Sequence, residues 1–241
     1  EVAIKVLPAS LAEESDFRSR FESEAKAVAG LRHNNIVQVF DFGDIEGTYY
    51  MVMELVRGQD LDSMLDKSPA LSAKNVLGIA SQVADALDYA HKMNLIHRDI
   101  KPSNVMIEGS EHDLRAVLTD FGIAKIRARD TSATKTGVLM GTMNYIAPEQ
   151  IRSAGEVDWR ADIYSLGVML FQLLTGQLPF QGENPGSVMV AHLQEPPPDP
   201  RQFSPDISPA AAAAILRALD KEPQNRQSTA CELVDSVIAA M

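Results

Sequence analysis

A lysine and a glutamate near the start of the chain each interrupt an apolar pattern. Lys5 lies within the β-branched run at residues 2–7, where side chains should alternate between the two faces of a strand. Glu24 occupies an inward position of the next segment, where apolar residues recur at helical spacing over residues 17–31. An inward carboxylate is costly unless it meets a cation, so Glu24 and Lys5 are predicted to pair. Taken alone, such a pair is more often structural than catalytic.

An asparagine and an aspartate flank a predicted hairpin in the middle of the chain. Asn104 precedes the strand-like residues 105–107, and Asp120 follows the strand-like residues 117–119. The polar stretch 108–116 joins the two strands, and antiparallel pairing would bring Asn104 and Asp120 together. A carbonyl oxygen and a carboxylate are suitable ligands for Mg²⁺. Both residue types also form turns, which is the alternative interpretation of the hairpin taken alone.

The sequence divides into two parts of different character, and the first part contains Lys5 and Glu24. It contains the strand and the helix just described, followed by strand-like stretches at residues 36–42 and 48–55. A turn containing Gly43 and Gly47 separates these stretches. The first part is therefore predicted to be a small sheet with one helix.

After Gly58 the pattern becomes mainly helical. An apolar stripe marks a helix through residues 76–90, a helix buried on all sides is predicted over residues 159–175, and a further helical stretch begins at Pro209. Residues 125–142 are polar and lack periodicity, which indicates a long exposed loop. Together the two parts predict an α+β fold.

The composition excludes several classes of protein. The chain has 241 residues, of which 45% are hydrophobic, and this is ordinary for a packed domain. A formal net charge of −11 disfavours nonspecific binding to nucleic acid or to anionic membranes. The single cysteine, Cys231, excludes an internal disulfide framework and fits the cytosol. No apolar run is long enough to span a bilayer, and no cysteine or histidine spacing indicates zinc.

Four short motifs occur in a fixed order along the chain. Residues 2–5 read VAIK, residues 97–104 read HRDIKPSN, residues 120–122 read DFG and residues 147–149 read APE. This ordered set resembles the strand lysine, the catalytic loop, the metal-binding loop and the end of the activation segment of protein kinases. One such motif would be weak, whereas four in the family's order make coincidence very improbable.

The resemblance covers essentially the whole chain and has finer features. Lys101, two residues after Asp99, is the form seen in serine/threonine kinases, and residues 141–150 are most similar to the eukaryotic-like kinases of bacteria. The implied fold has two lobes, with a partial small lobe and connecting segment at residues 1–57 and a mainly helical large lobe at residues 58–241. The implied activity is ATP-dependent phosphorylation of serine and threonine hydroxyls on proteins.

The resemblance also implies cofactors, partners and location. The cofactors are ATP and Mg²⁺ or Mn²⁺, and the partners are protein substrates, with a kinase dimer as a candidate arrangement for autophosphorylation. Neither nucleic acid nor direct membrane contact is expected for this segment. The implied location is the cytoplasm, and a membrane anchor of the parent protein would lie outside these residues.

Catalytic roles follow for the residues that match the family's motifs. Lys5 would hold the α- and β-phosphates of ATP, with Glu24 fixing its orientation. Asp99 would accept the proton of the substrate hydroxyl, and Lys101 would neutralise charge on the transferring phosphoryl group. The implied metal ligands are Asn104 and Asp120. The implied nucleotide contacts are Met53 at the back of the adenine pocket, the backbone of Glu54 and Val56, Ala3 and Met106 on the two faces of the ring, and Asp60 at the ribose.

Regulatory and supporting roles are implied in the same way. Arg98 would sense a phosphate on the activation loop, where Thr134 and Thr136 match phosphorylated positions in bacterial members. Thr142 is expected to face the substrate. Two supporting contacts are also implied: Glu149 would pair with Arg226, and Asp162 would hold the backbone of the catalytic loop.

The sequence departs from the family pattern at its beginning. Protein kinases normally start with a Gly-rich loop over the phosphates, and no such pattern precedes Lys5. We therefore expect that the chain begins partway into its small lobe without the first two strands, that the parent protein is active, and that this chain alone binds ATP weakly or not at all. The alternatives are an inactive fragment of an active kinase, a noncatalytic kinase-like binding module, and a small-molecule phosphotransferase of similar fold. The intact motifs disfavour the last two.

Overall fold

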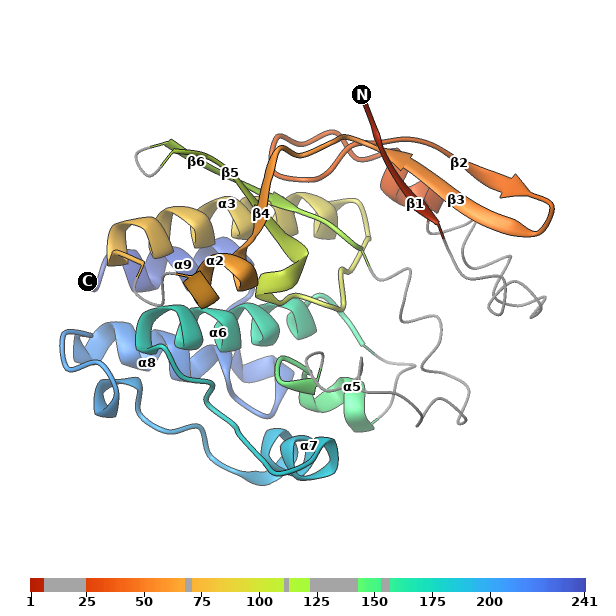
Figure 1. Cartoon of the computed structure of the whole chain (residues 1–241). Helices are drawn as coiled ribbons and strands as arrows, with labels where there is room; N and C mark the ends of the chain where they lie inside the picture. Colours follow the sequence, from red (N-terminus) through yellow and green to blue (C-terminus); the bar gives the residue numbers. More distant parts are fainter. Residues whose placement is uncertain (7–24, 68–70, 111–112, 122–142, 153–156) are drawn as a thin grey trace.

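The computed structural model has two parts (Figure 1): a small antiparallel sheet with a short helical segment, and a larger, mainly helical body that carries a second small sheet. This arrangement confirms the predicted α+β fold. The structure describes residues 1–6, 25–67, 71–110, 113–121, 143–152 and 157–241.

The first sheet has the strand order β1-β3-β2 and is antiparallel throughout. Its strands are β1 (Ala3–Val6), β2 (Val39–Ile45) and β3 (Thr48–Met53). Strand β2 begins and ends three residues later than predicted. Gly43, which was predicted to lie in the turn, lies inside the strand opposite Tyr50. The turn consists of Glu46 and Gly47, whose φ angles of 51° and 79° fit a two-residue hairpin turn.

The residues predicted to begin β2 join the two parts of the molecule instead. The Val37 N–H donates to the carbonyl of Leu118 at 3.0 Å, and the Leu118 N–H donates to the carbonyl of Asn35 at 2.8 Å. Ile36 forms an isolated parallel bridge to Leu118. Their apolar character therefore serves the contact between the two sheets rather than the first sheet.

The second sheet lies in the larger body, with the strand order β4-β5-β6. Its strands are β4 (Gly58–Asp60), β5 (Val105–Ser110) and β6 (Asp113–Leu118). The predicted hairpin is present, but the polar stretch 108–116 is not simply a connection, since Glu108 pairs with Arg115 and Gly109 with Leu114 in the ladder. Strand β4 was not predicted, because three residues are too few to show alternation.

Two predicted helices form the centre of the larger body. Helix α3 (Ala73–Lys92) begins at the N-cap Ser72 and buries the predicted apolar stripe. Helix α6 (Arg160–Thr175) is buried at every residue from Ala161 to Phe171, which confirms a helix packed on all sides. It ends at Gly176, whose φ of 72° suits a glycine.

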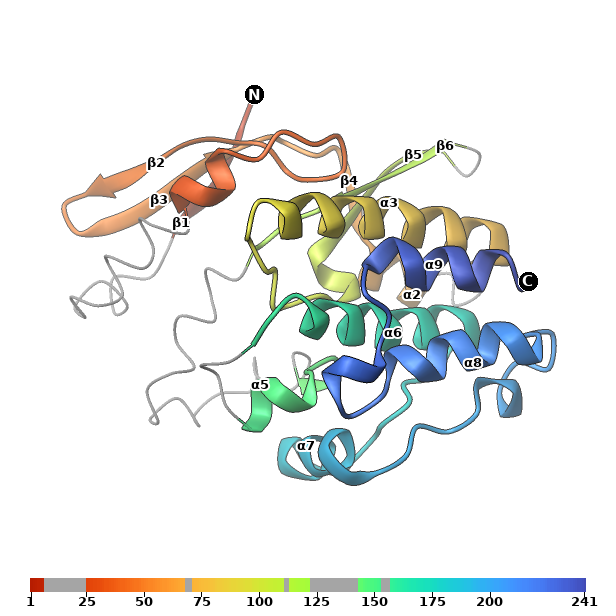
Figure 2. The same cartoon turned by 180° about the vertical axis from the view of Figure 1, so that it is seen from behind.

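The C-terminal helices are shorter than the pattern suggested. Helix α8 (Pro209–Ala218) begins at the predicted N-cap Ser208, whose hydroxyl accepts the N–H of Ala211. Helix α9 (Ala230–Ile238) follows after a break and packs along α3 (Figure 2). The remaining helices are α2 (Leu61–Lys67), α5 (Pro148–Arg152), α7 (Pro185–Gln194) and the short 3-10 segments Pro102–Asn104, Pro200–Gln202 and Pro223–Asn225.

Two predicted elements lie partly or wholly outside the described residues. They are residues 17–24 of the first predicted helix and all of the predicted loop 125–142. The described end of that helix, residues 25–29, is helical and buries Ala25 and Val28. Across the described ranges, we find no helix with the length and apolar character that crossing a membrane requires.

Candidate active site

The backbone of the segment 97–99 is organised around the buried imidazole of His97. Its Nε2 lies 2.8 Å from the carbonyl of Thr119, and its Nδ1 accepts the N–H of Asp99 at 3.2 Å. These two contacts place the ring proton on Nε2. Burial lowers the pKa of His97, so the ring is neutral at physiological pH. His97 thereby ties Asp99 to the segment that follows β6.

A carboxylate from α6 holds the same segment from below. Asp162 accepts the N–H of His97 at 2.8 Å and the N–H of Arg98 at 2.7 Å, and its Oδ2 lies 2.8 Å from Nε2 of His91. Burial acts to raise the pKa of Asp162, but the contact with His91 and the hydrogen bond from His97 hold it below its usual value. The ionised carboxylate anchors Arg98, which adopts a left-handed φ of 64°.

Two side chains converge on the carboxylate of Asp99. Lys101 Nζ lies 3.0 Å from Oδ2 of Asp99, and Asn104 Nδ2 donates to the same oxygen at 3.0 Å. Asn104 Nδ2 also donates to the carbonyl of Asp99 at 2.7 Å. The structure thus brings together three predicted site residues and sets the orientation of the carboxylate at the centre.

Asn104 and Asp120 flank the β5–β6 ladder as the hairpin predicted. Val105 pairs with Leu118, and the Thr119 N–H donates to the carbonyl of Asn104 at 2.9 Å. Because the amide nitrogen of Asn104 faces Asp99, its amide oxygen points away from that carboxylate. An amide oxygen and a carboxylate at adjacent strand ends are donors that fit Mg²⁺.

No larger cluster in the described part of the chain competes for a metal ion. Among these residues no group of three or more histidine, cysteine, aspartate and glutamate side chains could hold one. Mg²⁺ is commonly bound by one or two protein groups together with substrate phosphates and water, and the Asn104 and Asp120 pair matches that kind of site.

Lys5 reaches from β1 of the first sheet to the segment that follows β6 of the second sheet. Its Nζ lies 2.5 Å from Oδ1 of Asp120, and the two side chains are 38% and 43% exposed. The predicted partner, Glu24, lies outside the described residues, so the Lys5–Glu24 pair stays a prediction. The sequence reasoning missed the Lys5–Asp120 contact because both residues had already been assigned other partners.

The predicted nucleotide contacts lie on two ladders that flank residues 54–57, the connecting segment between β3 and β4. In the first sheet, Ala3 pairs with Met53. In the second sheet, Met106 pairs with Asp60. The N–H of Glu54 donates to the carbonyl of Gln38 at 2.8 Å, which leaves the Glu54 carbonyl as the backbone group that could contact adenine. Val56, the other predicted backbone contact, is half-buried.

Asp60 also caps a helix, a role the sequence reasoning did not foresee. Its carboxylate accepts the N–H of Ser63 at 2.8 Å and the hydroxyl of Ser63 at 2.7 Å, at the start of α2. Burial acts to raise the pKa of Asp60, but the two bonds from Ser63 outweigh it and lower the pKa. Any contact with a ribose would be shared with this cap.

A buried ion pair supports the segment that ends at α5. Arg226 donates to the two carboxylate oxygens of Glu149 at 2.7 and 2.8 Å, and also to the carbonyl of Arg160 at 2.8 Å. The predicted positions Thr134, Thr136 and Thr142 lie outside the described residues.

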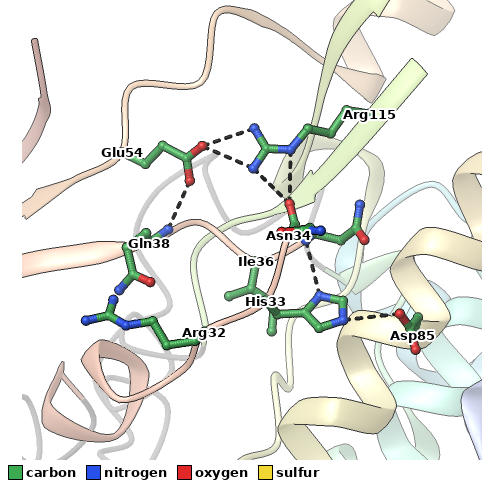
Figure 3. Close-up of a pocket in the computed structure, with 9 residues that line it drawn as sticks. Arg32, His33, Asn34, Ile36, Gln38, Glu54, Asp85 and Arg115 are labelled. Atoms are coloured by element: carbon green, nitrogen blue, oxygen red, sulfur yellow. Dashed lines mark hydrogen bonds and ion pairs between the residues drawn. The ribbon is translucent and has the colours of Figure 1, made fainter. Parts of the chain in front are cut away.

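An open pocket of about 520 Å³ lies beside the connecting segment (Figure 3). Its lining is polar and charged except for Ile36, and of the predicted site residues it contains only Glu54. Figure 3 shows the guanidinium of Arg115 reaching both the Glu54 carboxylate and the backbone of Asn34. The sequence reasoning missed Arg115. Its only local signal was a cation seven residues from Glu108 across a predicted hairpin.

Comparison with known proteins shows which family this chain matches. The protein kinase domain family matches residues 1–237. The serine/threonine-protein kinase PknB of Mycobacterium leprae is 40% identical over 237 residues, which cover 97% of this chain and 38% of that protein. The serine/threonine-protein kinase pkn3 of Myxococcus xanthus is 43% identical over 237 residues, which cover 95% of this chain and 43% of that protein.

A solved structure supports the same relationship. The crystal structure of the Mycobacterium tuberculosis PknI kinase domain matches with a TM-score of 0.77 and 33% identity, covering 100% of this chain and 86% of that one. The chain spans 38% of the length of PknB and 43% of the length of pkn3, so it corresponds to a part of each.

Proposed function

The chain belongs to the protein kinase family, and we propose that it transfers the γ-phosphoryl group of ATP to serine and threonine hydroxyls of proteins. Members of this family use ATP and a divalent metal ion. The observation that carries the proposal is the Asp99 carboxylate, which Lys101 and Asn104 hold by one oxygen. A carboxylate oriented in this way is suited to align a substrate hydroxyl.

Each residue around Asp99 has a different proposed role in phosphoryl transfer. Asp99 accepts the proton of the substrate hydroxyl, and Lys101, already 3.0 Å from that carboxylate, donates to the phosphoryl oxygens. Lys5 binds the α- and β-phosphates. Asn104 and Asp120 would hold Mg²⁺, which neutralises charge on the phosphates when bound. In this arrangement Lys5 exchanges its contact with Asp120 for the phosphates.

The adenine is proposed to lie between the two ladders. Ala3 and Met106 cover its faces, Met53 lies at the back, and the connecting segment provides the backbone of Glu54 and Val56. Asp60 contacts the ribose. The proposed division into residues 1–57 and 58–241 is supported by β4, which begins at Gly58 and pairs with β5 of the second sheet. A Cβ atom at Gly58 would lie 1.9 Å from the carbonyl oxygen of Ile107. Only glycine allows this approach of β4 to β5.

Regulation is proposed to act through the activation segment. Phosphorylation of Thr134 or Thr136 would pair with Arg98 and order the segment, and Thr142 would face the substrate. Glu24 would orient Lys5. We place the reaction in the cytoplasm, and phosphorylation of one copy by another in a dimer would start it. The lone Cys231 is in keeping with that compartment.

A phosphotransfer assay tests the proposal. The 241-residue chain and the full-length protein that contains it are incubated with Mg²⁺, labelled ATP and a general protein substrate, and phosphoserine and phosphothreonine are quantified. We expect label in the full-length protein and its loss in the Asp99→Asn variant. Absence of label from the full-length protein, with partner binding retained, would establish the noncatalytic alternative. Label in the full-length protein alone would support the expectation that the shorter chain binds ATP poorly.

A further inference from the structure

We infer that Arg115 is a positioning residue that holds the connecting segment in the conformation that binds adenine. The inference rests on the proposed function, because it concerns the nucleotide of the same reaction. Arg115 lies on β6, and within the described part of the chain it contacts the carboxylates of Glu54 and Glu108 and the carbonyl of Asn34, groups that are not proposed to contact phosphate or the protein substrate. Its proposed effect is therefore on the affinity for the base and not on the chemical step.

The Arg115 guanidinium joins the connecting segment to the loop before β2 (Figure 3). NH1 and NH2 donate to Oε1 of Glu54 at 3.0 and 3.1 Å. Nε and NH2 donate to the carbonyl of Asn34 at 3.0 and 2.8 Å. The other oxygen of Glu54 accepts the N–H of Gln38 at 3.3 Å, so the carboxylate is held from two sides.

The same cation reaches the other end of the connecting segment through Glu108. NH1 of Arg115 donates to Oε2 of Glu108 at 3.0 Å, and Oε1 of Glu108 accepts the backbone N–H of Arg57 at 3.3 Å. The first and last residues of the segment, Glu54 and Arg57, are thus both linked to one guanidinium. Val56, whose backbone is proposed to contact adenine, lies between them.

Charge makes this arrangement depend on the arginine. Burial acts to lower the pKa of Arg115, but the hydrogen bonds that it donates to Glu54 and Glu108 outweigh burial and raise the pKa. One cation stands between two carboxylates. Without it, Glu54 and Glu108 would repel each other at the two ends of the segment, and the Asn34 carbonyl would lose its donors.

Because these groups are partly exposed, we expect Arg115 to influence the position of the connecting segment more than the global stability of the fold. The side chains of Arg115, Glu54 and Glu108 are 37%, 27% and 31% exposed. Ion pairs at such exposure contribute little to global stability. A planar guanidinium with five donors nonetheless fixes the relative orientation of the groups it binds, which a lysine cannot do.

The decisive experiment compares two ligands of the wild-type protein and the Arg115→Met variant. ADP requires the adenine site, whereas tripolyphosphate uses only the phosphate site. We expect the KM for ATP and the Kd for ADP to rise about three- to tenfold, with kcat, the KM for substrate peptide and the Kd for tripolyphosphate within about twofold of wild type. Arg115→Lys keeps the charge but not the planar guanidinium. Its KM for ATP and its Kd for ADP should lie between those of the wild-type protein and those of Arg115→Met.

A matched control uses Arg217, which also joins a carboxylate and backbone carbonyls. It donates to Glu232 at 3.1 Å and to the carbonyl of Asn225 at 3.1 Å, within the C-terminal helices. Arg217→Met should leave the Kd for ADP unchanged. An equal loss of ADP and tripolyphosphate binding in Arg115→Met, or an equal loss in Arg217→Met, would overturn the positioning role.

Hydrogen exchange provides a readout that does not depend on catalysis. Arg115→Met should speed exchange of the Arg57 N–H, with exchange within α6 unaltered. If the wild-type protein transfers no phosphoryl group, the proposed function fails while this measurement still decides the role of Arg115. Unchanged exchange at Arg57 together with an unchanged Kd for ADP refutes the inference.

Discussion

Lys5 Nζ lies 2.5 Å from Asp120 Oδ1, and this contact joins β1 of the first sheet to the segment that follows β6 of the second. Both side chains are more than a third exposed, so the pair contributes little to stability. Its position, with one group proposed to bind phosphate and the other metal, fits a site that exchanges this contact for ligands.

Replacement of Lys5 should therefore affect activity far more than stability. We expect Lys5→Met to lower kcat/KM for phosphoryl transfer by at least about a hundredfold, because transition-state charge loses a donor. The free energy of unfolding should change by less than about 1 kcal/mol. Lys74→Met, at an exposed position of α3, is the control and should change neither. A large loss of stability with activity retained would assign Lys5 a structural role.

Replacement of Asp162, unlike that of Lys5, should affect stability more than activity, because its carboxylate is buried against the backbone of His97 and Arg98. In Asp162→Asn, the new amide group faces an N–H that then lacks an acceptor, at a cost of about 1–3 kcal/mol. The shift of His97 and Arg98 should also lower kcat. Urea denaturation followed by circular dichroism measures the first effect. Asp158→Asn, which removes a half-exposed partner of Arg160, should cost less than about 1 kcal/mol. Similar losses in both variants would contradict the anchoring role.

The Glu149–Arg226 pair should be sensitive to the loss of one partner. Arg226 has no exposed side-chain surface, so Glu149→Gln leaves a buried cation without its counter-charge. We expect a loss of about 3–5 kcal/mol in the free energy of unfolding. Glu222→Gln, which breaks a half-exposed pair with Arg152, should lose about 1 kcal/mol or less. Equal effects would show that Arg226 finds another partner.

His192 should make stability depend on pH. Its Nδ1 lies 2.8 Å from the hydroxyl of Tyr164, and its Nε2 lies 3.1 Å from the carbonyl of Asn144. Burial, together with Lys221, lowers the pKa of His192 from 6.5 to about 4. Between these values the unfolded chain binds more protons than the folded chain, so acidification destabilises the fold.

The measurement is the slope of the unfolding free energy against pH. The contribution of His192 to the free energy of unfolding, up to about 3 kcal/mol, should be fully present above pH 6.5 and should decrease as the pH falls towards 4. His192→Gln should remove that part of the slope, while His97, whose pKa is also lowered by burial, titrates in both proteins. Parallel curves for the two proteins would show that His192 is not the group responsible.

Several elements could be predicted because their signals are local. The periodic stripe of α3, the continuous apolar run of α6 and the N-cap Ser208 depend on residues within a few turns of one another. Helix α7 was missed although Asn184 and Ser187 form a capping box at its start. Its face pattern is weak, since residues of both faces are apolar, and the cap alone did not suffice for a prediction.

Strand β2 shows where local signals mislead. The apolar residues Ile36 and Val37 read as its beginning, yet they pair with Leu118 in the other part of the molecule. Their apolar character is correctly interpreted as burial, but a β-branched pair does not specify which strand it meets. Register depends on the partner, which lies about eighty residues away along the chain.

What the sequence by itself determined are the residue types proposed to do the chemistry and their order: Lys5, Asp99, Asn104 and Asp120 within motifs that resemble those of protein kinases. Only the tertiary structure decided two of the ion pairs, namely Lys5 with Asp120 and Arg115 with Glu54. The reason is physical: any of the 22 lysines and arginines could pair with many of the 33 acidic residues. Which pairs form depends on how strands distant in sequence approach, and no local pattern encodes that approach.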